Sequence, residues 1–134
     1  MPPLVLALID SVFALAFHHQ ARADRGIMPD HESATVRATM AGPNFGDPDL
    51  KGIEIRVSIT LNPRGEEREV SESAVAFVVD LDDERLLAGQ LALAELPLDR
   101  SGLARLIGEL EAWCYERIPI QKLAGDGDGD DGDA

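Results

Sequence analysis

Apolar and polar residues alternate along several stretches of this 134-residue chain, and the period of each stretch predicts its secondary structure. The clearest stretch is 53–61, where apolar residues at odd positions alternate with polar residues at even positions. A period of two predicts a strand with one buried face and one solvated face. Residues 34–40 alternate in the same way, whereas 74–81 is apolar on both faces and predicts a central strand covered on both sides.

The N-terminal stretch is the most apolar part of the chain. Between residues 4 and 17, 12 of 14 residues are apolar, and Pro2 or Pro3 suits the first turn of a helix. Fourteen helical residues rise about 21 Å, which is short of the roughly 30 Å hydrocarbon core of a membrane. The run Ala21–Ala23 resembles a signal-peptide cleavage site, but no basic side chain precedes the apolar stretch. We therefore expect a buried or interface helix, with a cleaved signal as the alternative.

The C-terminal third contains a second predicted helix and one ambiguous segment. Apolar residues recur at helical spacing over 103–114, after a candidate N-cap at Asp99 or Ser101. Residues 86–96 fit either a strand or a helix. Gly89 disfavours the helix, and the short link to the preceding strand favours a hairpin, so we predict a strand there.

Together these elements predict an α+β domain over residues 1–124. It contains an N-terminal helix, a three- to four-stranded, mostly antiparallel sheet, and a C-terminal helix packed on the sheet. Residues 26–32 and 42–49 predict loops because they are rich in Gly, Pro and Asp. Residues 125–134 contain five Asp and four Gly and predict a disordered acidic tail.

The charge balance restricts the class of partner. The chain has 25 acidic and 12 basic residues and a formal net charge of −13, which disfavours binding to nucleic acid or to an anionic membrane surface. Without the five tail aspartates the net charge changes from −13 to −8, so the folded part is itself acidic and suits a basic protein partner. The single cysteine, Cys114, excludes an intramolecular disulfide and fits a reducing, cytoplasmic compartment.

Three histidines are the candidate metal ligands: His18, His19 and His31. Adjacent helical residues point about 100° apart, so His18 and His19 do not easily face one metal ion. His31 and Glu32 begin like a two-histidine zinc motif, but a threonine stands where the second histidine belongs. The simpler expectation is that these are surface histidines near a helix end, where an imidazolium suits the helix dipole.

The rest of the sequence assembles no catalytic set and no cofactor motif, so we expect no cofactor. Ser11 and His18 would lie about 10.5 Å apart along a helix, too far for a nucleophile and base that need about 3 Å. Cys114 lies beside Trp113 on the apolar stripe and is expected to be a buried structural cysteine. Residues 42–46 lack the Lys-Ser or Lys-Thr pair of a phosphate-binding loop.

The solvated face of the predicted sheet carries the candidates for partner binding. Arg37 and Arg56 are placed to pair with Glu54 across strands, or to bind a carboxylate of another protein. An acidic stretch follows the second strand. The candidate partner-binding residues are therefore Arg37, Glu54, Arg56, Glu66, Glu67 and Glu69.

These observations favour a small, acidic, non-enzymatic protein-interaction module over an enzyme. One version is an inhibitor or accessory protein of a phage or mobile element that acts on a basic partner. Two alternatives stay open. The first is a homo-oligomer or assembly subunit joined through the 4–17 helix, and the second is a metal-dependent enzyme or ligand binder that uses His18, His19 and His31.

Overall fold

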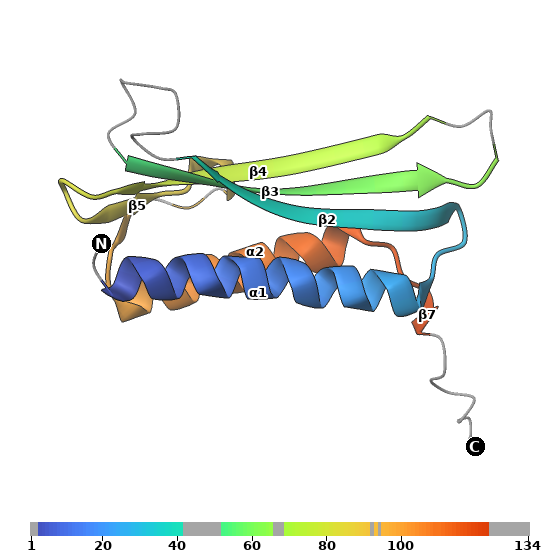
Figure 1. Cartoon of the computed structure of the whole chain (residues 1–134), viewed down its shortest axis with the longest axis horizontal. Helices are drawn as coiled ribbons and strands as arrows, with labels where there is room; N and C mark the ends of the chain where they lie inside the picture. The colour runs from blue at the N-terminus through green and yellow to red at the C-terminus, as the bar shows by residue number, and fades with distance from the viewer. Residues whose placement is uncertain (1–2, 42–51, 66–68, 92, 94, 124–134) are drawn as a thin grey trace, which may run out of the picture.

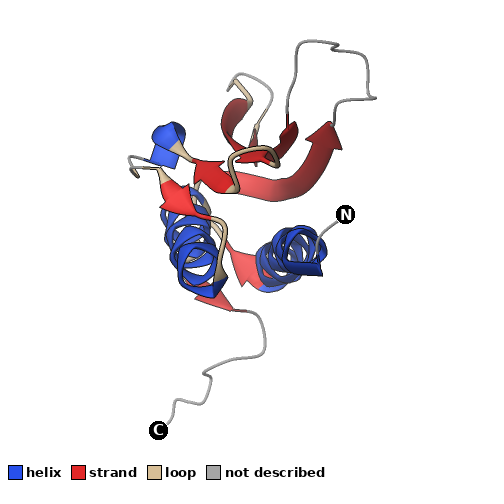
Figure 2. Cartoon of the chain, turned by 90° about the vertical axis from the view of Figure 1, so that its left-hand side faces the viewer, coloured by secondary structure: helices blue, strands red, loops and turns tan. Residues whose placement is uncertain are grey.

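Five antiparallel strands form a sheet, and two helices lie side by side under one face of it (Figures 1 and 2). The computed structural model describes residues 3–41, 52–65, 69–91, 93 and 95–123. Its elements are α1 (Pro3–Arg25), β1 (Gly26–Ile27), β2 (His31–Ala41), β3 (Gly52–Pro63), β4 (Ser71–Asp80), β5 (Arg85–Leu87), the 3₁₀ turn η1 (Gly89–Leu91), β6 (Leu96–Pro97), α2 (Arg100–Arg117) and β7 (Lys122–Leu123). The α+β prediction is confirmed, with five strands in the sheet rather than three or four.

The strand order is β2-β3-β4-β5-β6, so β4 lies at the centre of the sheet as predicted. Ala34 opposes Leu61 and Val36 opposes Ile59, which places the apolar residues of β2 and β3 on one shared face. Ile55 is fully buried on that face. The predicted strands over 34–40, 53–61 and 74–81 are therefore confirmed, each slightly longer than expected. A separate pair, β1 with β7, joins the chain after α1 to the chain after α2.

Helix α1 begins at Pro3 but continues well beyond Phe17, through a polar stretch, to Arg25. Its buried side belongs to the hydrophobic core under the sheet, so α1 is part of the fold and not an appendage to it. These buried residues are Val5, Leu8, Val12, Leu15, Ala16, His19 and Ala23. By length and composition α1 would also pass as a membrane span, a test that the core helix of a soluble protein passes too.

Helix α2 starts where the capping signal predicts. The Asp99 side chain accepts a hydrogen bond from the backbone N–H of Gly102 at 2.8 Å, which makes Asp99 the N-cap. Leu110 and Cys114 are fully buried on the predicted stripe. Gly102 packs so closely that a Cβ atom there would collide with the carbonyl oxygen of Pro97.

The single strand predicted over 86–96 is wrong. The chain forms β5, then η1, and returns to the sheet only in β6. The backbone N–H of Ala76 in β4 donates instead to the side-chain oxygen of Gln90 at 2.8 Å. A side chain of η1 thus takes the place of a strand partner for β4 beyond the end of β5. The predicted 42–49 loop and the acidic tail lie outside the described residues.

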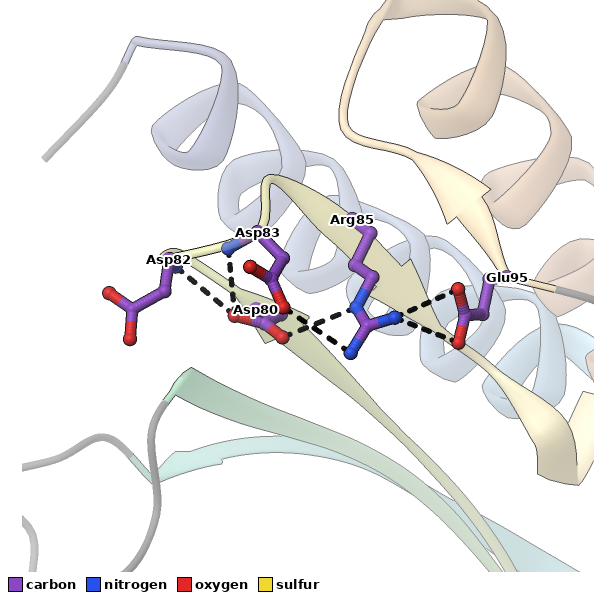
Figure 3. A network of polar contacts seen from close by, with 5 residues as sticks. All are labelled: Asp80, Asp82, Asp83, Arg85 and Glu95. Atoms are coloured by element: carbon purple, nitrogen blue, oxygen red, sulfur yellow. Dashed lines mark hydrogen bonds and ion pairs between the residues drawn. The ribbon is translucent and has the colours of Figure 1, made fainter.

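The turn between β4 and β5 is held by charged side chains (Figure 3). Asp80 Oδ1 accepts from the backbone N–H groups of Asp82 and Asp83, each at 3.1 Å, and these bonds close the turn. Arg85 then binds Asp80 at 3.3 Å, Asp83 at 3.5 Å and Glu95 at 2.9 Å. The Asp83 hydrogen bond is the main reason that the pKa of Asp80 lies below its usual value. The acidic residues of this segment therefore stabilise the turn between β4 and β5.

Candidate functional site

The sheet face opposite the helices carries a groove of about 580 Å³ across β2, β3 and β4. It is lined by Thr35, Arg37, Thr39, Arg56, Ser58, Thr60, Glu72, Ser73 and Ala74. Arg37 opposes Ser58 and Arg56 opposes Thr39, so the two arginines occupy diagonal positions on neighbouring strands. Diagonal side chains on one sheet face lie close enough for long residues to interact. The lining of the groove thus combines two arginines with several hydroxyl-bearing residues.

The predicted pairing of these arginines with Glu54 is not formed. Glu54 opposes Ala41 on β2, four residues along the strand from Arg37. Among the described residues, no ion pair engages Arg37 or Arg56. Of the other acidic candidates, Glu69 is exposed just before β4, while Glu66 and Glu67 lie outside the described residues.

A second cluster lies at the contact between α1 and α2. One ligand atom each of His18, His19 and Glu111 lies within 4.8 Å of the other two. The two histidine rings meet edge to face at 5.0 Å, so adjacent positions on α1 do bring both imidazoles to one place. Glu111 belongs to α2. His31 begins β2 and is not part of this group.

His19 is fully buried, which corrects the expectation of a surface histidine near a helix end. Its ring packs edge to face on Tyr115 at 4.9 Å, and its Nδ1 accepts a hydrogen bond from Arg22 Nε at 3.2 Å. Burial, and then the charges of Arg22 and His18, lower the pKa of His19 to about 4, so the ring is neutral at pH 7. Its Nε2 atom is buried without a hydrogen-bond partner, as is the Nη2 atom of Arg22.

The positions of Cys114 and Ser11 agree with the non-catalytic roles expected from the sequence. Cys114 is buried as expected, and burial raises the pKa of its thiol to about 11, far above the range in which a thiolate forms at pH 7. Ser11 and His18 lie seven residues apart on the continuous helix α1, consistent with the exclusion of a direct catalytic contact.

The sequence pattern did not point to Arg22, Glu111 or Tyr115 as parts of a site. Arg22 lies with its Cζ atom 4.3 Å from the centre of the Tyr115 ring, so both helices contribute to the surroundings of His19. Only the way α1 packs on α2 brings these side chains together. The single available signal was the helical spacing that aligns Glu111 with Tyr115 on α2 and His18 with Arg22 on α1.

Comparisons with models of protein families, with curated proteins and with solved structures each gave no match. The function is therefore inferred from the groove on the sheet and from the cluster between the helices.

Proposed function

We propose that this protein is a non-enzymatic interaction module that binds an acidic segment of a protein partner in the groove on its open sheet face. The observation that carries the proposal is the diagonal pair Arg37 and Arg56, which no described carboxylate neutralises. Two positive charges on one face without a described partner are a suitable place for a carboxylate to bind.

The groove differs in charge from the chain as a whole. The formal net charge is −13, yet the groove lining contains two arginines and one acidic residue, Glu72. Guanidinium groups bind carboxylates in a bidentate manner, and the neighbouring hydroxyls can donate to or accept from a peptide backbone. The groove therefore favours an acidic segment. The rest of the surface is acidic, and it repels acidic proteins that do not place such a segment in the groove. The basic partner that the net charge suggests remains a separate prediction, for the acidic surface outside the groove.

Side-chain amides occupy part of the β2 edge and the part of β4 beyond its pairing with β5, which favours binding on the face over strand addition. On β2, Gln20 donates to the carbonyl of Ala34 at 2.9 Å and accepts from the N–H of Val36 at 2.7 Å. On β4, Gln90 accepts from Ala76. Backbone groups that already have partners do not need an added strand.

Binding of fluorescent peptides to the full-length chain tests the proposal. The panel contains Glu/Asp-rich ten-residue peptides, matched Lys-rich peptides, and a peptide copying residues 125–134. We expect acidic peptides to bind, and the double variant Arg37→Gln/Arg56→Gln to weaken binding about tenfold or more, since charge-assisted bonds are lost. The control Arg100→Gln/Arg105→Gln makes the same charge change at exposed positions of α2.

Three results would contradict the proposal. Equal binding by both double variants would place the interaction elsewhere on the surface. Binding confined to the Lys-rich peptides would favour the basic partner instead. Binding confined to the 125–134 peptide would make the chain's own tail the occupant of the groove.

Self-association through α1 is the second candidate, because Leu6, Phe13 and Phe17 form an exposed apolar stripe along it. Their exposed fractions are 51%, 40% and 77%. At about 200 Å² for a fully exposed large side chain, the stripe offers roughly 340 Å² per copy. A standard interface buries about 800 Å² per partner, so this stripe alone does not make a stable dimer.

Sedimentation of Phe17→Asp against the wild type tests self-association better than removal of the helix. Removing residues 1–20 would also remove Val5, Leu8 and Val12 from the core. A concentration-dependent dimer that disappears in the variant would favour this candidate over the first.

A further inference from the structure

We propose that His18, His19 and Glu111 form a binding site for a divalent transition-metal ion of the zinc class, independent of the groove. The three ligand atoms already lie within 4.8 Å of one another. Zinc binds such ligands at about 2.0–2.2 Å, so the three side chains would have to move closer together than they are now. The site joins α1 to α2, so metal binding would also tie the two helices to each other.

The state of the His19 side chain points to a ligand. His19 is fully buried, and its Nε2 atom has no hydrogen-bond partner. A buried polar nitrogen without a partner costs free energy, and a metal–nitrogen bond is one way to complete it. His18 is exposed, so one of the three ligands is accessible from solvent.

The donor set selects the class of metal. Two imidazole nitrogens and one carboxylate oxygen suit zinc and its neighbours, whereas calcium and magnesium prefer sites made of oxygen atoms alone. Three protein ligands leave a fourth tetrahedral position open for water or for a small ligand.

Arg22 competes with the metal for His19. Arg22 Nε donates to His19 Nδ1 at 3.2 Å, which places the ring proton on Nε2. Coordination through Nδ1 requires the lone pair that Arg22 now uses. Coordination through Nε2 requires the proton to move to Nδ1, which then cannot accept from Arg22. Either way Arg22 must release the ring, so its guanidinium weakens metal binding.

Zinc binding to the full-length chain, measured by competition with a chromophoric chelator, tests the site. Excess calcium is present throughout to occupy the carboxylates of the acidic tail. We expect one zinc ion per chain, and at least about tenfold weaker binding in His18→Gln and in Glu111→Gln. The matched control is Glu109→Gln, an exposed position on the same helix. His19 is left intact because its substitution would disturb the core.

Arg22→Met gives the decisive second measurement. It keeps an unbranched side chain near Tyr115 and removes the competing donor, so we expect tighter zinc binding by about tenfold. Circular dichroism of each variant confirms that it is folded. Three results would overturn the proposal: no zinc binding by the wild type, equal binding by Glu109→Gln and Glu111→Gln, or unchanged binding by Arg22→Met. The last result would mean that His19 is not a ligand.

Discussion

Gln20 substitutes for a missing strand along the free edge of β2, and this role can be tested by one substitution. Its amide nitrogen donates to Ala34 at 2.9 Å and its amide oxygen accepts from Val36 at 2.7 Å. Gln20→Met keeps the length and helix propensity of the side chain but removes both hydrogen bonds to β2, together with an exposed one that Gln20 donates to Asp24 at 2.9 Å. Because the bond to Asp24 is exposed, the loss of stability is expected to come mainly from the two bonds to β2.

The expected loss of stability follows from those two bonds. An intramolecular hydrogen bond contributes about 1 kcal/mol net, and a buried backbone group left without a partner costs about 1–3 kcal/mol. Ala34 and Val36 are buried residues, with 3% and 8% of their surface exposed, so water reaches the freed backbone groups only in part. We therefore expect the free energy of unfolding to fall by about 2–3 kcal/mol.

Urea denaturation followed by circular dichroism measures this loss, with Ala21→Met at an exposed neighbouring position of α1 as the control. Hydrogen exchange provides a local measurement: the Val36 amide should exchange faster in Gln20→Met, while the Ile59 amide on β3 should change little. A loss below about 0.5 kcal/mol, the usual range for surface substitutions, would refute the reasoning. Unchanged exchange at Val36 would do so as well.

The other predictions concern single positions. Gly102→Ala should destabilise the protein because a Cβ atom meets the Pro97 carbonyl, whereas Gly108→Ala, with open space around it, should stabilise α2 by about 0.5–1 kcal/mol; chemical denaturation of the pair checks the contrast. Asp99→Ala should cost about 1 kcal/mol in the same assay by removing the N-cap of α2, and no loss would contradict that role. The pKa of His19 falls from 6.5 to about 4 on folding, so acidification protonates the unfolded chain first. The neutral His19 ring therefore contributes fully to the free energy of unfolding above about pH 6.5, and this contribution declines as the pH falls towards 4. We expect the free energy of unfolding to fall by about 2 kcal/mol between pH 7 and pH 5, measured by urea melts with a chelator present. Melts that do not change across that range would contradict the prediction.

The sequence predicts the layers of this fold well because each long element carries a clean period. The alternation over 53–61 needs no tertiary information, since a strand covered on one face shows it directly. Residues 86–96 lack such a period, and their structure depends on a contact between Gln90 and the distant residue Ala76. A side chain that replaces a strand partner leaves no trace in the hydrophobic pattern. The error therefore falls where tertiary contacts decide the local structure.

The two candidate sites also differ in how far the sequence predicts them. The arginines of the groove could be placed on one sheet face from the sequence, because register follows from alternation, although their lack of a partner could not. The helix cluster could not be predicted, since the contact between α1 and α2 determines which of their polar residues meet. Spacing along one helix says that His18 and Arg22 are neighbours, but it says nothing of Glu111 on the other.

Both sites depart from what folding alone favours. Buried Nε2 of His19 and Nη2 of Arg22 have no partner, and each such group costs about 1–3 kcal/mol. That is a large share of the about 5–15 kcal/mol by which a domain is stable, and apolar side chains at these positions would avoid it. In the groove, Arg37 and Arg56 are two positive charges at diagonal positions with no ion-pair partner among the described residues. Local conflicts of this kind are expected at functional positions, because binding a ligand resolves them. The proposed metal would give the His19 ring a partner while releasing Arg22 from it, and the proposed acidic segment would neutralise the two arginines, which is why each ligand is sought at that place.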